Sequence, residues 1–567
     1  MVQATELAYL SIREAGELFR RKQLSPVELT EALLERTRRV QEKLVPYVTL
    51  TPEIALDQAR RAEAAFAKGG AGTASPLLGI PIAYKDIVMT KGIRTTCGSA
   101  VHEDWLPEVD AAVVERWQGA GTVMLGKLST HEFALGLQPP GHLLLPARNP
   151  WNPAHIPGGS SSGSGTALAA GLTLGAIGTD TGGSIRGPAA FCGISGLKPT
   201  YGRVSRYGIV TLAWSLDHAG PMARSAEDCA ILLNALAGHD PRDPAAATQP
   251  VEDYTAGLNA GVKGLRIAIP TNFFHEKLGD EAKAALYAAA DVLRGLGATV
   301  EEITIPQAEL AGALLAIMFP EAYAYHARDL AERPEKYPAP LRNRFRSGAL
   351  FTANEYVQAQ RARSIMRDRF AEAMRDYDVL LTSPTQGDAA TYAESIVPNS
   401  RRGPNYNGAF NMTGLPAIAI PSGFSRRNLP LSLTISGRPF EEATVLRVAH
   451  AFQQASDWHR RHPDLDAALA APLDAPQAEA QPADQTQPPA PVEEQREPQP
   501  DLAAVVHAEV TEETVRQRAA LAGVALDDAG VAEAALALEG ALKALRRLDP
   551  HAIRRVEPAV RFSPLGG

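Results

Sequence analysis

The segment "LGIPIAYKDIV" (residues 78–88) begins a stretch in which short apolar runs alternate with helical patterns. This segment and "GTVMLGKL" (121–128) predict short buried strands, whereas "DAAVVERWQGAG" (110–121) predicts a helix that ends at glycine. The same order returns at 264–306, where "GLRIAIP" and "ATVEEITIP" flank "DEAKAALYAAADVLRGLG". The alternation predicts an α/β fold, with helices layered on a buried sheet.

The composition is that of a globular protein and excludes some partners. The chain has 567 residues, of which 45% are hydrophobic and 21% charged. Its net charge of −8 gives no excess of basic residues that would indicate nucleic-acid binding. Charges or prolines interrupt every long apolar run, and the N-terminus lacks a signal-peptide pattern. Three scattered cysteines are too few for a disulfide framework or a Cys-only zinc site. We therefore expect a cytoplasmic protein without a metal site or a membrane contact.

The chain divides by composition near residue 470. Residues 1–470 hold the α/β pattern, including a helix in "LSPVELTEALLERTRRV" for which Ser25 and Glu28 predict a capping box. Residues 471–500 contain eight prolines, six glutamines and six acidic residues, a composition typical of a linker. Residues 501–567 predict a small helical module with an extended tail. One helical face of this module carries Val531, Ala535, Leu538, Leu542 and Leu545.

Two Gly-Ser patches lie close together, "PGGSSSGSG" at 157–165 and "GTDTGGSIRG" at 178–187. Such clusters are most often plain loops, and neither has the G-K-[ST] of a phosphate-binding loop. "GSSSG" matches the G-x-S-x-G elbow with Ser161 as nucleophile, but the prolines before it argue against the strand which that motif requires. Consecutive glycines before Ser184 can instead bring backbone N–H groups toward a developing oxyanion.

A serine nucleophile needs a base, and the sequence offers two candidates. His155 lies in a Pro-rich loop, where a solvated or structural role is expected. Lys85 lies inside an apolar run; a lysine in a strand normally reaches solvent, but burial would lower its pKa and make it a base. The residues alone leave these alternatives open.

Both patches, together with "GIPIAYKDI", resemble the amidase signature family, and the resemblance extends from about residue 5 to residue 465. It implies an α/β/α layered fold with a large mixed central sheet, no cofactor, and a Ser–Ser–Lys triad. Ser184 would be the acylated nucleophile, Lys85 the base, and Ser160, held by a cis peptide, the proton relay between them. The spacings of 75 residues from Lys85 to Ser160 and 24 from Ser160 to Ser184 agree with the family motif.

The same resemblance implies the surroundings of the nucleophile. The amides of Thr181, Gly182 and Gly183 would form the oxyanion hole with that of Ser184. Asp180 and Arg186 would stabilise the loop; alternatively, Arg186 touches the substrate.

The sequence departs from the A subunit of glutamyl-tRNA amidotransferase, a glutaminase of this family, at three places. "PEAYAYHARDLAERPEKY" replaces a motif like E-A-S-S-N-L-x-R-Y-D-G, "STHEF" replaces "NMDEF", and Pro404 lies near the position of an aspartate. A glutamine pocket is therefore not expected. Leu143, Leu144 and Leu145 either line an apolar pocket or pack under their loop.

The C-terminal module weakly resembles two small partner proteins, those of the tRNA amidotransferase and of carboxybiuret hydrolase. The alternative is a generic two-helix appendage. We expect the module to dock on its own amidase domain, with Phe562 of "EPAVRF" as an anchor.

The leading hypothesis is an amidohydrolase that cleaves a small carboxamide, or a related urea or carbamate C–N bond. The second hypothesis is a glutaminase or a component of a transamidation complex, and the third is a non-catalytic scaffold. The expected partners are a small-molecule amide and, in the case of a homodimer, a second copy of the chain. The sequence does not identify the acyl or amine group.

Overall fold

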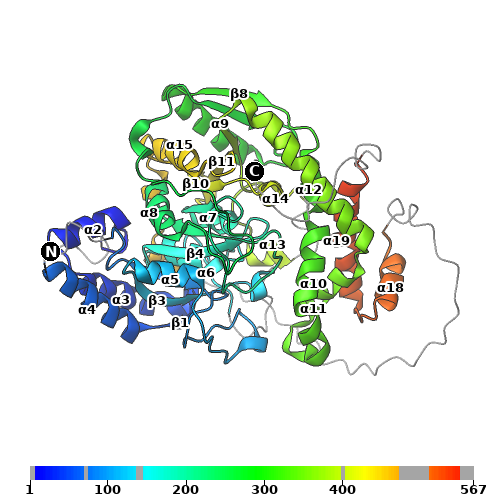
Figure 1. The fold of residues 1–567 in the computed structure, drawn as a ribbon, viewed down its shortest axis with the longest axis horizontal. Coiled ribbons are helices and arrows are strands. Elements are labelled where there is room, and N and C mark those ends of the chain that lie inside the picture. Colours follow the sequence, from blue (N-terminus) through cyan, green and yellow to red (C-terminus); the bar gives the residue numbers. More distant parts are fainter. Residues whose placement is uncertain (1–6, 69–74, 136–144, 397–402, 472–509, 549–567) are drawn as a thin grey trace.

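A single mixed β-sheet forms the centre of the molecule in the computed structural model, which describes residues 7–68, 75–135, 145–396, 403–471 and 510–548 (Figure 1). In spatial order, the eleven strands within these residues are β1 (Tyr47–Leu50), β3 (Val123–Leu128), β2 (Pro81–Lys85), β4 (Gly175–Asp180), β6 (His218–Ala223), β5 (Ser195–Lys198), β10 (Ala417–Phe424), β11 (Pro430–Gly437), β9 (Val379–Thr382), β7 (Arg266–Pro270) and β8 (Thr299–Ile303).

Strand direction changes along the sheet. β2 runs parallel to β3 and β4, and β7 runs parallel to β8 and β9. The central pairs from β4 to β9 are antiparallel, as is the edge pair β1–β3. The expected α/β fold with a large mixed sheet is confirmed.

Helices pack around this sheet and at one end of the molecule. They are α2 (Ile12–Arg20), α3 (Pro26–Leu44), α4 (Pro52–Ala67), α5 (Ala112–Gly119), α6 (Ser162–Ala169), α7 (Arg186–Cys192), α8 (Ala226–Leu236), α9 (Asp280–Gly295), α10 (Leu315–Glu332), α11 (Ala339–Arg346), α12 (Ala353–Ala373), α13 (Tyr392–Ile396), α14 (Tyr406–Thr413), α15 (Glu442–Gln454), α16 (Leu465–Ala470), α18 (Glu512–Leu521) and α19 (Asp528–Leu545). Two short 3₁₀ helices, η5 (Ala308–Leu314) and η7 (Ser347–Leu350), contact the C-terminal helices α19 and α18.

The elements predicted from periodicity are present, with shifted ends. The capping box of α3 forms as expected: the Ser25 side chain accepts from the Glu28 amide, and the Glu28 side chain accepts from the Ser25 amide. The two buried strands of 78–128 are β2 and β3 with α5 between them, and the later stretch is β7, α9 and β8. Their ends lie a few residues inside the quoted segments because capping and pairing, rather than hydrophobicity alone, set the boundaries.

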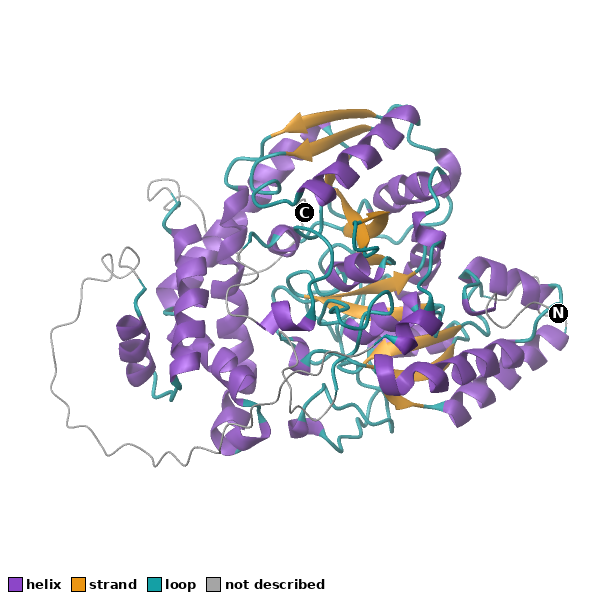
Figure 2. Ribbon diagram, turned by 180° about the vertical axis from the view of Figure 1, so that it is seen from behind, coloured by secondary structure: helices purple, strands orange, loops and turns teal. Residues whose placement is uncertain are grey.

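The C-terminal helices α18 and α19 lie beside α10, α11 and α12, at the end of the molecule away from α2 (Figures 1 and 2). Val531, Leu538, Leu542 and Leu545 are all buried, and they belong to the same hydrophobic cluster as α10, α12 and α14. Residues 472–509, which include nearly all of the predicted linker at 471–500, and the tail with Phe562 lie outside the described residues.

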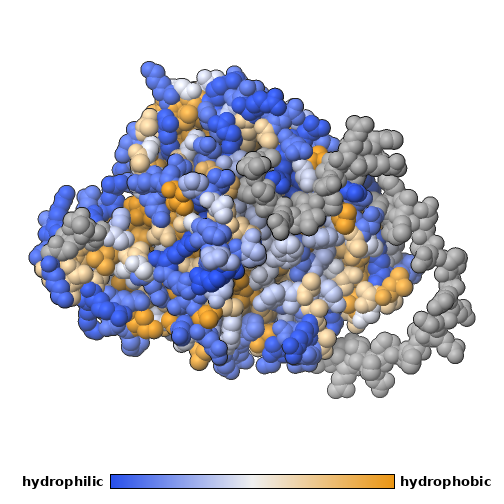
Figure 3. Space-filling view, viewed as in Figure 1, coloured by the Kyte–Doolittle hydropathy of each residue, from blue (hydrophilic) through white to orange (hydrophobic). Residues whose placement is uncertain are grey.

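The surface mixes polar and apolar groups. On the face shown in Figure 3, hydrophobic residues form small groups among hydrophilic ones. Among the helices of the described residues, none is long and apolar enough to span a membrane.

Candidate active site

The two Gly-Ser patches come together at the ends of neighbouring elements. β4 ends at Asp180, a loop carries Ser184, and α7 begins at Arg186. The other patch leads into α6, and its Ser161 amide donates to the Ser184 carbonyl over 3.2 Å. A backbone hydrogen bond therefore joins the two patches, which residues 166–177 separate in the sequence.

Lys85, the last residue of β2, is fully buried and points at the first patch. Its Nζ donates to Ser160 Oγ over 2.6 Å and to Thr179 Oγ1 over 2.7 Å. Burial lowers the pKa of Lys85 to about 7, although the carboxylates of Asp180 and Asp217 oppose the shift. The lysine is thus not the solvent-reaching residue that an isolated strand position favours. Ser160 is buried as well, whereas Ser184 is partly exposed.

The rival nucleophile and base are placed differently. The Ser161 side chain is buried, and its Oγ donates to the Thr179 carbonyl over 3.3 Å and accepts from the Thr179 amide over 3.2 Å. This hydroxyl therefore anchors α6 to β4. The other candidate base, His155, forms an isolated bridge with Thr391.

The segment "STHEF" holds the backbone of the first patch. The Gly159–Ser160 peptide is cis. The Ser160 carbonyl accepts from the His131 amide and from Thr130 Oγ1, both over 3.1 Å. A Cβ on Gly159 would lie 1.9 Å from His131 Cε1, so only glycine fits beside this ring.

Asp180 organises the loop that carries Ser184. Its carboxylate accepts from the amides of Gly183 and Ile185, and from Nε and a terminal nitrogen of Arg186 over 3.0 and 2.9 Å. Burial alone would raise the pKa of Asp180, but the Arg186 guanidinium holds it well below the usual range. Both side chains are fully buried, so in this structure Arg186 braces the loop.

One amide of the expected oxyanion hole has another partner. The Gly183 N–H donates to Asp180 Oδ1 over 2.7 Å, because the buried carboxylate attracts the nearest donors. Among the hydrogen bonds of the described residues, none occupies the amides of Thr181, Gly182 and Ser184. Of these, the amides of Gly182 and Ser184 lie nearest the nucleophile in the chain and remain donors for a ligand at Ser184.

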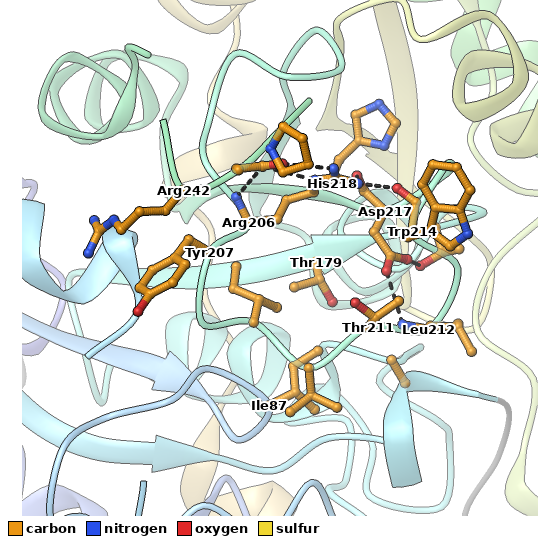
Figure 4. A pocket seen from close by; sticks show the side chains of 16 residues that line it. Ile87, Thr179, Arg206, Tyr207, Thr211, Leu212, Trp214, Asp217, His218 and Arg242 are labelled. Atoms are coloured by element: carbon orange, nitrogen blue, oxygen red, sulfur yellow. Dashed lines mark hydrogen bonds and ion pairs between the residues drawn. The ribbon is translucent and has the colours of Figure 1, made fainter. Parts of the chain in front are cut away.

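A cavity of about 270 Å³ opens beside the strand ends (Figure 4). Thr179 and Thr181 form part of its wall, so it adjoins both the Lys85 network and the loop of Ser184. Its apolar lining comes from Ile87, Ala134, Ile209, Val210, Leu212 and the half-exposed Trp214. Leu143 and Leu144 lie outside the described residues, and Leu145 is 68% exposed.

The charges around this cavity are paired. Arg206 donates to the Asp243 carboxylate, and Arg242 forms ion pairs with Glu115 and Asp240 while its guanidinium lies 4.1 Å from the ring centroid of Tyr207. Carboxylates therefore neutralise both arginines, and neither offers a free positive charge to a ligand in the cavity.

Sequence reasoning missed three residues that hold the site. Thr179 is the second partner of Lys85; Asp217 accepts from Thr181 Oγ1 over 2.5 Å. Asn411 Nδ2 donates to both the carbonyl and the carboxylate of Asp180 over 2.9 Å, and its Oδ1 accepts from Arg186. Thr179 lies within the quoted motif, but nothing in the local sequence places Asn411 near it.

Comparison with known proteins identifies the class of enzyme. The Amidase family model matches residues 28–446, and the chain belongs to this family. Its members and relatives act on amide C–N bonds, so the chain is an enzyme of that class and the scaffold alternative is set aside.

Individual relatives cover most of the chain. The A subunit of glutamyl-tRNA(Gln) amidotransferase from Methylococcus capsulatus is 45% identical over 480 residues, which cover 80% of this chain and 98% of that protein. A solved chain from a vestigial protein complex, described as revealing the evolutionary origins of an s-triazine catabolic enzyme, is 32% identical with a TM-score of 0.74 over 79% of this chain and 99% of its own. A bacterial aryl acylamidase of the amidase signature family is 25% identical, with a TM-score of 0.73 over 82% and 99%.

Proposed function

We propose that this chain hydrolyses a primary carboxamide through an acyl-enzyme on Ser184, in the manner of an amidotransferase glutaminase. The observation that carries the proposal is the 2.6 Å contact between a buried lysine, whose pKa lies near 7, and the hydroxyl of Ser160. A neutral Lys85 can accept a proton at ordinary pH, and the partly exposed Ser184 is accessible to substrate.

Each proton in the proposed reaction has a donor and an acceptor. Lys85 takes the proton of Ser160 as Ser160 takes that of Ser184, and Ser184 Oγ bonds to the carbonyl carbon. The oxyanion is stabilised by the amides of Gly182 and Ser184. Protonated Lys85 returns the proton through Ser160 to the amide nitrogen, the C–N bond breaks and ammonia leaves. Water, activated by the same relay, then cleaves the ester and restores Ser184.

Glutamine is the first substrate to test. The support is the identity to the glutamyl-tRNA(Gln) amidotransferase chain, which spans nearly the whole length of that relative. This reading replaces the stand-alone hydrolase of a small carboxamide that the three sequence departures favoured. In it, the ammonia released at Ser184 passes to a separate protein of the complex.

A small apolar carboxamide is the second candidate substrate. Its support is the cavity beside Thr179 and Thr181, whose wall is mainly apolar and whose arginines are neutralised by carboxylates. Each methylene buried there would contribute about 0.8 kcal/mol to binding.

Ammonia release separates the two candidates. Glutamine, asparagine, a straight-chain series from propionamide to hexanamide, and benzamide are compared at equal concentration, with Ser184→Ala as the control. Fastest ammonia release from glutamine supports glutamine as the substrate. A kcat/KM that increases from propionamide to hexanamide supports a small apolar carboxamide. Release by Ser184→Ala at the wild-type rate would contradict both.

A further inference from the structure

The C-terminal helices make close contacts with the main body that the proposed reaction does not require. α19 packs on η5, and a Cβ on Gly312 of η5 would lie 3.2 Å from Ala544 Cβ and 3.4 Å from the Gly540 carbonyl oxygen. At the end of the same helix, Arg547 forms an ion pair with Glu309 over 3.7 Å. The backbones of α19 and η5 are therefore held at close range.

The far end of η5 lies next to the loop that carries the nucleophile. Leu314, the last residue of η5, is buried, and its Cδ2 lies 3.6 Å from where a Cβ on Gly182 would stand. Asn405 Nδ2, which lies 3.4 Å from the same Cβ position, donates to the Gly182 carbonyl over 2.9 Å. Leu314 and Asn405 therefore border Gly182, whose own N–H is one of the two proposed oxyanion-hole donors.

A second line of contact begins at α18. Arg518 donates to both carboxylate oxygens of Glu355 over 2.9 and 3.0 Å, and Glu355 is the buried capping-box residue of α12. Two turns further along α12, Arg363 donates to the Ser215 carbonyl over 2.6 Å. Ser215 is the neighbour in sequence of Trp214, which lines the cavity. Through Glu355, α18 therefore supports α12, and α12 in turn holds the segment of the cavity wall at Trp214.

The interface between the C-terminal helices and the main body contains specific polar contacts as well as apolar ones. Asn343 of α11 donates to Asp527, the N-cap of α19, over 2.8 Å, and a Cβ on Gly530 would overlap the Asn343 side chain at 2.6 Å. Arg344 Nε donates to Glu533 over 2.7 Å. These polar pairs between α11 and α19 fix the register of α19, which a non-specific apolar contact would leave free.

We propose that the helix pair α18–α19 is a positioning element of the active site, acting through Leu314 on Gly182 and through Glu355 and α12 on the cavity wall. A donor to an oxyanion is effective only within a few tenths of an ångström of its productive position. The helix pair therefore raises the rate of acylation of Ser184 as well as the stability of the fold; its effect on acylation rests on the proposed function.

The experiment uses full-length variants and two readouts, of which one is independent of turnover. The first is the rate of covalent labelling of Ser184 by a fluorophosphonate, resolved into its saturation constant and its maximal rate. The second is hydrogen exchange in peptides that cover residues 178–187. Thermal unfolding of each variant reports stability separately.

Two pairs of variants test the two lines of contact. Leu314→Ala should lower the maximal labelling rate about tenfold and speed exchange at 178–187, whereas Leu314→Met, which refills the space, should restore both. Arg518→Ala should lower the maximal rate several-fold. Its matched control is Arg516→Ala, because Arg516 pairs within the module, with the exposed Asp528, and should leave both readouts unchanged.

The outcomes distinguish positioning from simple stabilisation. If Leu314→Ala and Arg518→Ala lower the unfolding temperature but leave labelling and exchange at 178–187 as in the wild type, the helices only stabilise the fold and the proposal is overturned. A wild-type protein that is not labelled at Ser184 would count against the proposed reaction instead, and the exchange data would still decide whether the helices order the loop.

Discussion

At the scale of single residues, the site depends on buried polar groups that hydrogen-bond to one another. Burial lowers the pKa of Lys85 to about 7, whereas Arg186 keeps Asp180 charged. Two ionisable groups thus have pKa values shifted away from their ordinary ranges at one end of the sheet. This arrangement provides a base and a rigid loop from neighbouring strands.

The pH dependence follows from the lowered pKa of Lys85. Because this pKa lies at about 7 instead of near its ordinary value, Lys85 is neutral above that pH and gains a proton as the pH falls through it. The kcat/KM for ammonia release should therefore fall with pH below about 7 and level off above it. Lys85→Ala should lower the plateau by about two to four orders of magnitude. A Lys85→Ala enzyme with the same acid limb and near-normal turnover would rule out the lysine as base.

Asn411 gives a second residue-scale prediction. Asn411→Ala removes two donors from Asp180 and one acceptor from Arg186 in a fully buried network. An unpaired buried group costs about 1–3 kcal/mol. If about 2 kcal/mol of this cost appears in the transition state, acylation slows roughly thirtyfold. Stopped-flow labelling with a fluorophosphonate measures the change; an unchanged rate would show that Arg186 alone holds the loop.

At the scale of elements, α19 presents one buried face and one exposed face. Leu538 is fully buried in the second hydrophobic cluster, whereas Leu536, on the same helix, is 43% exposed. The helix is therefore amphipathic and is stabilised by its packing on the amidase domain rather than by its own length.

This asymmetry supplies a matched pair of variants. Leu538→Ala should lower the free energy of unfolding by about 2–5 kcal/mol through the cavity it leaves. Leu536→Ala should change the free energy by no more than about 0.5 kcal/mol. Chemical denaturation followed by tryptophan fluorescence measures both. Equal effects of the two substitutions would mean that α19 is not seated as the structure shows.

At the scale of the whole molecule, residues 510–548 occupy a surface that the rest of the chain would otherwise expose. The ion pairs of Arg344 with Glu533 and of Arg518 with Glu355 flank the buried apolar face. We predict that a chain carrying a protease site within residues 472–509, once cut, keeps both pieces together during size-exclusion chromatography at low concentration. Separation of the pieces would show that the covalent connection, and not the interface, holds the module in place.

The sequence by itself determined the fold class, the strands and helices of 78–128 and 264–306, and the apolar face of α19. It could do so because hydrophobic periodicity and helix caps are local, and each is written in consecutive residues. The Gly-Ser patches likewise marked the loop of Ser184, although the residues alone left Ser161 and His155 as rivals.

Apart from the triad that the family resemblance implied, only the tertiary structure decided which groups meet. Lys85 and Ser160 lie 75 positions apart, Asn411 lies 231 positions from Asp180, and Leu314 reaches Gly182 from a different element. The pKa of Lys85 and the partner of the Gly183 amide were equally beyond the sequence. Both depend on burial and on the direction of neighbouring dipoles, which arise when distant segments pack together and exclude water.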